Sequence, residues 1–272
     1  MNNLIKRLPV IILGIPSVLY LVQIGGAPFS IIVTIVLLLC SYEFLALTKK
    51  IGASPNSPMA MISITLIAAL YYLIPNIEIT HFLIIVFSII ILTVFTETIR
   101  GLSNSTMNIA VTFLSILYIG VLFGSMIALR NFDTFYGTQL TLCMLISVWV
   151  CDSFAYSFGK AFGKKKLIER LSPKKTVVGF LAGNAGSFLT IYILNYLDFT
   201  KVELSISSMV IFAVIIGCFG QWGDISESMF KREANTKDSS SLLFGHGGFL
   251  DRCDSLILTS PLMLIFILVL HA

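Results

Sequence analysis

Apolar runs of about 20 residues follow one another along most of this chain, and they limit its fold more than any other feature. Only 12% of the 272 residues are charged, about half the share in an ordinary soluble domain. Backbone groups in lipid must bond within their own segment, so each run is expected to be a helix. The runs are continuous rather than alternating, which disfavours a β-barrel. We predict an all-α, polytopic integral membrane protein.

We predict about nine transmembrane helices. The expected segments are 5–24, 27–47, 58–76, 79–99, 105–129, 137–159, 177–197, 205–229 and 255–271.

Lysine and arginine residues predict the orientation of this helical bundle. With the N-terminus in the cytoplasm, only Arg130 and Lys201 of the 18 basic residues fall outside. One missing or additional helix would place basic loops on both sides of the membrane. We therefore predict a cytoplasmic N-terminus and cytoplasmic loops at 159–176 and 231–255. Attraction of these loops to anionic lipid would explain their charge without any catalytic role.

Several carboxylates lie inside or beside the apolar runs, where a charge costs a few kcal/mol on insertion scales. They are Glu43, Asp152, Asp224 and Glu227. Residues three apart share one face of a helix, so Asp224 and Glu227 are expected to lie together. Asp251 and Asp254 would do the same if their segment is helical. Ion pairing with nearby basic residues is the alternative, and for Glu43 it is the favoured interpretation.

Carboxylates surrounded by lysine and arginine are typical of phosphoryl transfer. Mg²⁺ is usually held by one or two carboxylates together with substrate phosphates, and cations hold the remaining phosphate oxygens. Gly247 and Gly248 allow backbone N–H groups to approach a phosphate closely. The chain has neither a P-loop nor a GxGxxG motif, so ATP hydrolysis by a Walker fold is not supported.

The stretch SMFKREANTKDSSSLLFGHGGFLDRCD, residues 228–254, resembles the signature of the phosphatidate cytidylyltransferases. The matching residues are Ser228, Lys231, Arg232, Lys237, Asp238, His246, Gly247, Gly248, Asp251, Arg252 and Asp254. Upstream matches are Gly223 with Asp224, Asp152 with its neighbours up to 159, and the segment 172–176. The resemblance therefore covers about 150–255. One position departs from the family pattern, because Val178 stands where an acidic residue usually precedes the glycine.

The resemblance implies an enzyme of phospholipid biosynthesis that transfers CMP from CTP to phosphatidate, giving CDP-diacylglycerol and pyrophosphate. It implies Mg²⁺ as cofactor. Two metals are the usual arrangement for such a displacement, one is the minimum, and a divalent ion with a second cation is the alternative. The expected metal ligands are Asp224, Asp251 and Asp254. The expected catalytic residues are Asp224, Asp251, Lys237, His246 and Arg252. The expected substrate contacts are Lys175, Ser228, Lys231, Arg232, Gly247, Gly248 and Asp152.

On this interpretation, residues 1–135 form scaffold or interface helices, and residues 136–272 form a catalytic region with its site on the cytoplasmic side. The expected partners are CTP, phosphatidate and membrane lipids, with no nucleic acid. In a bacterium the location would be the inner membrane. We also expect a homodimer, because closed two-fold dimers are the commonest oligomers.

Three other functions remain open. The first is another CTP-using membrane lipid enzyme, such as a polyprenol kinase. The second is an ion-coupled transporter that uses Asp152, Asp224 and Glu227, although the chain shows no repeat of broken helices. The third is a membrane scaffold without catalysis, which would leave the cluster of carboxylates and lysines unexplained.

Overall fold

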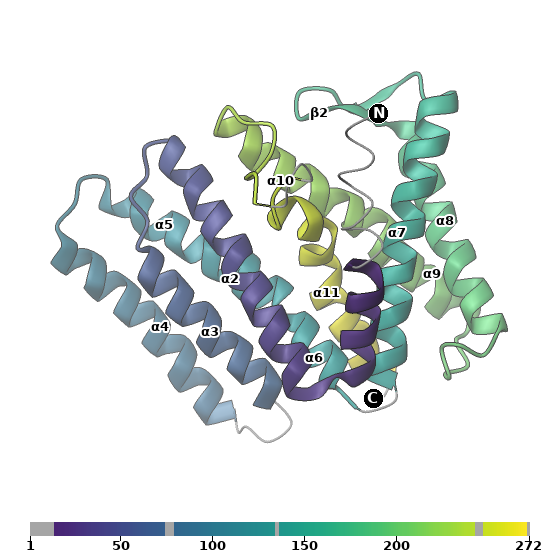
Figure 1. Ribbon diagram of the computed structural model, residues 1–272, viewed down its shortest axis with the longest axis horizontal. Helices are drawn as coiled ribbons and strands as arrows, with labels where there is room; N and C mark the ends of the chain where they lie inside the picture. Colours follow the sequence, from purple (N-terminus) through teal and green to yellow (C-terminus); the bar gives the residue numbers. More distant parts are fainter. Residues whose placement is uncertain (1–13, 74–78, 134–135, 243–246, 271–272) are drawn as a thin grey trace. The chain divides into compact units, whose positions relative to one another are not determined.

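The computed structural model describes residues 14–73, 79–133, 136–242 and 247–270, and most of them are helical (Figure 1). Within these described residues, seven helices are long and apolar enough to cross a membrane. They are Gly26–Lys50, Leu83–Arg100, Ser105–Asn131, Tyr136–Phe162, Val177–Tyr196, Ile206–Glu233 and Leu250–Leu270. Two shorter apolar helices are Gly14–Ile24 and Ser57–Leu73. Each of these corresponds to one predicted segment, so the all-α polytopic fold is confirmed.

The helices form two compact units. Unit 1 contains Met1–Ala128 and Phe230–Cys253, and unit 2 contains Leu129–Met229 and Asp254–Ala272. The units interleave along the chain, because the segment Phe230–Cys253 belongs with the N-terminal helices. The functional division at residue 135 stays a prediction.

Unit 1 is built from α2 (Gly26–Lys50), α3 (Ser57–Leu73), α4 (Ile79–Arg100) and α5 (Ser105–Ser115). A π-helical segment, η2 (Ile116–Phe123), continues α5 and leads into α6 (Ser125–Asn131). α3 packs against α2, α4 and η2, and Figure 1 shows α2, α3 and α4 side by side. An aromatic group of Phe44, Tyr118 and Phe230 joins α2 and η2 to the last turns of α10, with ring centroids 5.2–6.3 Å apart.

The outer face of α4 shows why this unit needs lipid. Ile84, Phe87, Ile91, Phe95 and Ile99 recur every three or four residues, and each is more than half exposed. This spacing places them on one face of the helix. A continuous apolar face of this kind would be unstable in water, so the bilayer accounts for it.

Unit 2 contains α7 (Tyr136–Phe162), which packs along α8 (Val177–Tyr196). A short antiparallel hairpin of β1 (Lys166–Ile168) and β2 (Ser172–Thr176) joins these two helices. The hairpin was not predicted, because its sequence is basic and lacks the apolar alternation of a typical strand. α9 (Ile206–Val214) then contacts α8 and continues through the π-helical η3 (Ile215–Gly220).

Three helices, α6, α10 and α11, belong to both units. α10 (Gln221–Glu233) follows η3 directly, and α11 (Leu250–Leu270) begins five residues before the predicted start at 255. The earlier start places both Asp251 and Asp254 within helix. The segment that the signature spans is therefore the end of α10, a connecting loop and the first turns of α11. The cytoplasmic placement of this loop stays a prediction.

Candidate active site

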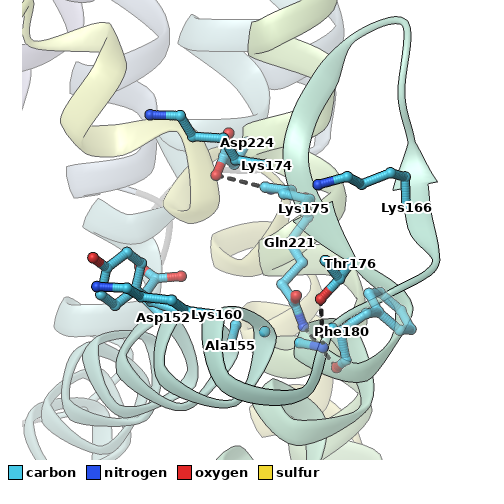
Figure 2. A pocket seen from close by; sticks show the side chains of 14 residues that line it. Asp152, Ala155, Lys160, Lys166, Lys174, Lys175, Thr176, Phe180, Gln221 and Asp224 are labelled. Atoms are coloured by element: carbon cyan, nitrogen blue, oxygen red, sulfur yellow. Dashed lines mark hydrogen bonds and ion pairs between the residues drawn. The ribbon is translucent and has the colours of Figure 1, made fainter.

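A pocket of about 580 Å³ lies in unit 2, where α7, the hairpin, α8 and α10 meet. Figure 2 shows Asp152 on α7 and Asp224 on α10 with lysines from α7 and from both strands. The four lysines are Lys160, Lys166, Lys174 and Lys175. Only Lys175 was among the predicted substrate contacts. Four positive charges against two negative ones suit a strongly anionic ligand such as a triphosphate.

The hairpin is held against α7 and α8 by close backbone approaches. Thr176 is the N-cap of α8, and its hydroxyl accepts a hydrogen bond from Gly179 N at 3.1 Å. A Cβ added at Gly163 would lie 2.3 Å from Thr176 Oγ1, and one at Gly179 would lie 2.7 Å from the Ala155 carbonyl oxygen. Glycine is therefore needed at both positions, and the capped turn fixes the lysines that precede it.

Lys175 connects the hairpin to α10. Its ammonium group lies 2.8 Å from Asp224 Oδ2 and donates to the Gln221 carbonyl oxygen at 3.1 Å. The Gln221 side chain in turn donates to the carbonyl oxygens of Phe180 at 3.1 Å and Gly217 at 2.7 Å. Gln221 was not predicted as a site residue, because its partners are backbone atoms that leave no trace in residue spacing. It fixes the start of α10, from which Asp224 enters the pocket.

Three carboxylates of unit 2 form what we call the acid cluster: Asp224, Glu227 and Asp254. One oxygen of each lies within 4.8 Å of the others, and Glu227 is fully buried. A Cβ added at Gly223 would lie 2.3 Å from the Asp254 carbonyl oxygen. α10 and α11 therefore approach closely at this glycine, and the close approach brings Asp224 beside Asp254.

The acid cluster fits a hard divalent cation. Mg²⁺ binds oxygen at about 2.0–2.1 Å in an octahedron, so neighbouring ligands are roughly 3 Å apart and opposite ones roughly 4 Å apart. Three carboxylate oxygens within 4.8 Å of one another would have to move closer together to bind one such ion directly. The cluster brings together two of the three predicted ligands, Asp224 and Asp254, and adds Glu227. Sequence spacing had placed Glu227 on the same helix face as Asp224, but not among the ligands.

Asp251, the third predicted ligand, belongs to unit 1 and has other partners. Its Oδ1 accepts from Lys231 Nζ at 2.6 Å. Its Oδ2 accepts from Ser239 N at 3.0 Å, Ser239 Oγ at 2.9 Å and Gly248 N at 2.7 Å. Gly247 has a φ of +82°, and a Cβ added there would lie 2.6 Å from Asp251 Oδ2, so no other residue fits at this position. The Gly248 N–H that was expected to face a phosphate thus binds Asp251, and the metal role of Asp251 stays a prediction.

The other predicted residues have less defined surroundings. Arg232 is exposed and donates to the Thr236 carbonyl oxygen at 3.1 Å. Lys237 and Arg252 are exposed, while Ser228 is buried and donates weakly to Asp224 Oδ1 at 3.5 Å. His246 lies outside the described residues. The structure therefore brings together Asp152, Lys175, Asp224 and Asp254 in unit 2, and Lys231 with Asp251 in unit 1; their catalytic roles stay predictions.

Comparisons with known proteins agree with the sequence signature. A model of the cytidylyltransferase family matches residues 5–270. A phosphatidate cytidylyltransferase of Bacillus subtilis (strain 168) is 30% identical over 256 residues, which cover 93% of this chain and 93% of that one. A phosphatidate cytidylyltransferase of Staphylococcus haemolyticus (strain JCSC1435) is 39% identical over 165 residues, 60% of this chain and 61% of that one. One of Haemophilus influenzae is 41% identical over 131 residues, 47% of this chain and 46% of that one.

Proposed function

The chain belongs to the cytidylyltransferase family, and from this membership and the geometry of unit 2 we propose that it is a phosphatidate cytidylyltransferase. The enzyme transfers CMP from CTP to phosphatidate and releases pyrophosphate. The similar proteins of Bacillus subtilis and Staphylococcus haemolyticus are phosphatidate cytidylyltransferases. The product, CDP-diacylglycerol, is an activated precursor for phospholipid synthesis.

One structural observation gives the proposal its main support. Asp224 lines the lysine-rich pocket and also belongs to the acid cluster. A nucleotide held by the lysines would therefore place its phosphates beside the carboxylates that suit Mg²⁺. Proximity of this kind supplies most of what phosphoryl transfer requires, because the chemistry depends mainly on positioning and charge stabilisation.

The reaction exchanges one bond to phosphorus for another. A phosphate oxygen of phosphatidate bonds to the α-phosphorus of CTP, and the bond from that phosphorus to the oxygen bridging to the β-phosphate breaks. Lys160, Lys166 and Lys174 hold the triphosphate and the departing pyrophosphate, while Lys175 is positioned by Asp224 at the edge of the acid cluster. Mg²⁺ bound by the cluster would supply neutralisation of the phosphate charge. Phosphatidate is already a nucleophile, so no covalent enzyme intermediate is needed.

The membrane fold fits the two substrates. The acyl chains of phosphatidate stay in the bilayer at a gain of about 0.8 kcal/mol per buried CH₂, whereas CTP is a soluble polyanion. We place the lysine-rich pocket on the cytoplasmic side, because the basic residues of the chain concentrate there under the predicted topology. In a bacterial cell this is the cytoplasmic face of the inner membrane.

The test uses the purified full-length protein in detergent with phosphatidate, Mg²⁺ and CTP labelled at either the α- or the γ-phosphorus. The expected result is α-label in the lipid fraction, γ-label in pyrophosphate, and no turnover without phosphatidate. γ-Label in the lipid would instead identify a kinase, and a folded wild-type protein that forms no labelled lipid would exclude the proposal. Asp224→Asn serves as the matched inactive variant, since it removes one cluster charge without changing side-chain size.

A further inference from the structure

Glu43 lies in an apolar part of α2, and its side chain is only 1% exposed. Sequence reasoning favoured an ion pair for it. Among the described residues, its carboxylate instead accepts four hydrogen bonds from neutral donors. Oε1 accepts from Ser240 Oγ at 2.6 Å and Phe249 N at 3.0 Å. Oε2 accepts from Ser239 Oγ at 2.9 Å and Leu250 N at 2.8 Å.

These donors come from both ends of the loop between α10 and α11. Ser239 and Ser240 lie shortly after α10, whereas Phe249 and Leu250 form the start of α11. The N-terminus of a helix has free N–H groups and a positive dipole end, so it favours an anion. Glu43 thus serves as the cap of α11 from a helix about 200 residues earlier, and it holds the two ends of the loop together.

The same hydrogen bonds continue to Asp251. Ser239 Oγ lies 2.9 Å from Glu43 Oε2 and 2.9 Å from Asp251 Oδ2. A hydroxyl has a single hydrogen, so Ser239 links the two carboxylates and donates to one of them at a time. Asp251 then holds Lys231 at 2.6 Å. The order of contacts is therefore Glu43, Ser239, Asp251 and Lys231.

The packing around these groups leaves little room for other arrangements. A Cβ added at Gly248 would lie 2.1 Å from Ser239 Oγ and 2.3 Å from Glu43 Oε2. Phe44, the next residue on α2, packs edge-on against Phe230 of α10 with centroids 5.2 Å apart. The loop is thus tied to α2 by polar contacts, and the end of α10 that precedes it is tied to α2 by an aromatic contact.

From this geometry we propose that Glu43 is a positioning residue for the transferase reaction. It orders the described ends of the loop, 234–242 and 247–249, and the first turn of α11, and so fixes Asp251 and Lys231, two residues of the signature. The inference rests on the proposed function. Glu43 itself is fully buried behind the loop and acts through Ser239 and the backbone of α11. It adds a positioning carboxylate from the N-terminal helices, which the sequence analysis had assigned to scaffold or interface.

The decisive variant is Glu43→Gln, which keeps the size of the side chain. Each carboxylate oxygen of Glu43 faces one hydroxyl and one backbone N–H. A hydroxyl can turn and accept from the new amide NH₂ group, but a backbone N–H cannot. Glutamine therefore loses one hydrogen bond to the start of α11 in either orientation.

The matched control is Glu97→Gln. Glu97 is also in unit 1, is 2% exposed, and is hydrogen-bonded to Arg100 and Asn108, not to the loop. Amide hydrogen exchange across residues 236–252 and steady-state kinetics are measured below the unfolding temperature of every variant. Glu43→Gln is expected to speed exchange in this segment and to lower kcat by roughly fivefold or more, because one hydrogen bond to the start of α11 is lost. KM for CTP should change much less, because Glu43 does not line the lysine-rich pocket.

Glu97→Gln is expected to keep both the exchange pattern of 236–252 and a near wild-type kcat. An equal loss of kcat in both variants would show that Glu43 only stabilises the fold, and would overturn the proposal. Wild-type exchange and wild-type kcat in Glu43→Gln would overturn it as well.

If Glu43→Gln does not fold, Ser239→Ala provides the measurement. Its kcat is expected to fall roughly fivefold, because one hydrogen bond is lost, and an unchanged kcat would overturn the proposal. A wild-type protein that makes no CDP-diacylglycerol would exclude the proposed function, while the exchange experiment would still test the ordering of the loop.

Discussion

Asp251 and Asp254 lie three residues apart on α11, but their surroundings are opposite. Asp251 accepts hydrogen bonds from Lys231, Ser239 and Gly248, so both of its oxygens already have donors. Asp254 accepts from Ser255 N at 2.7 Å and otherwise faces the carboxylates of Asp224 and Glu227. Within one turn of helix, Asp251 is thus surrounded by hydrogen-bond donors and Asp254 by other carboxylates.

This difference helps to distinguish carboxylates that stabilise the fold from carboxylates that could bind a metal. Carboxylates that face each other repel unless a cation lies between them, whereas a carboxylate with several donors gains little from a metal. By this criterion Asp254 is the stronger ligand candidate, and Asp251 holds the signature loop and Lys231. The family signature contains both residues and cannot distinguish the two roles.

The largest expected effect comes from Asp254→Asn. We expect turnover to fall by more than the roughly 10- to 100-fold that loss of an outer-shell partner costs, because a ligand of the acid cluster is removed. The thermal stability without Mg²⁺ should stay equal or rise, since the variant relieves repulsion among three acids. Stabilisation by Mg²⁺, about 2.7 kcal/mol at 100 times the dissociation constant in wild type, should disappear. Thermal unfolding with and without Mg²⁺ measures both.

Asp251→Asn is the paired variant that sharpens the comparison. It removes the charge partner of Lys231, and both side chains are largely buried, at 11% and 7% exposure. Breaking a buried pair costs about 3–5 kcal/mol, so the unfolding temperature should fall even without Mg²⁺, while the stabilisation by Mg²⁺ persists. If Asp251→Asn instead keeps its stability and loses the Mg²⁺ response, Asp251 is a metal ligand as the sequence predicted, and our distinction is wrong.

Gly223→Ala tests whether the approach of α10 to α11 creates the acid cluster. The added methyl group would lie 2.3 Å from the Asp254 carbonyl oxygen, so the helices must separate, at a cost of about 1–3 kcal/mol for overpacking. We expect turnover to fall by roughly tenfold or more, with a higher Mg²⁺ concentration needed for half-maximal rate.

Gly220→Ala is the control for this change. Its nearest neighbour would be Thr259 Cγ2 at an ordinary 3.4 Å, and alanine favours helix over glycine. Its turnover and Mg²⁺ requirement should stay close to those of wild type. Equal behaviour of the two alanine variants would show that close helix approach at Gly223 does not shape the metal site.

The helices could be predicted from the sequence because a continuous apolar run carries its signal locally. The hairpin could not, since β1 and β2 are short and basic and are fixed by Thr176 and by close approaches at Gly163 and Gly179. These contacts depend on helices that pack only in the folded chain. The predicted membrane bundle was therefore right in its spans and incomplete in the one element that carries three of the pocket lysines.

The candidate site shows the same limit. The resemblance to a known family pointed to Asp224 and Lys175 upstream of the signature and to Asp254 at its end. It did not give Gln221, whose partners are carbonyl oxygens, or the loop contacts of Glu43, whose partners lie about 200 residues away. Spacing on one helix was enough to pair Asp224 with Glu227, but only the approach of α11 at Gly223 shows which acids meet.

The smallest expected effect concerns the lysine-rich pocket, as the positive counterpart of the acid cluster. Lys166 and Lys174 are exposed and line the pocket, so each should contribute only the small energy of an exposed charge pair. Alanine at either position is expected to raise KM for CTP by roughly two- to fivefold, with little change in kcat and in KM for phosphatidate. The effect should shrink at high salt, because exposed charges are screened. The control is Lys164→Ala, because Lys164 belongs to the same basic run but does not line the pocket. An equal rise in KM for CTP in this variant would show that the nucleotide is attracted by general positive charge and not by this pocket.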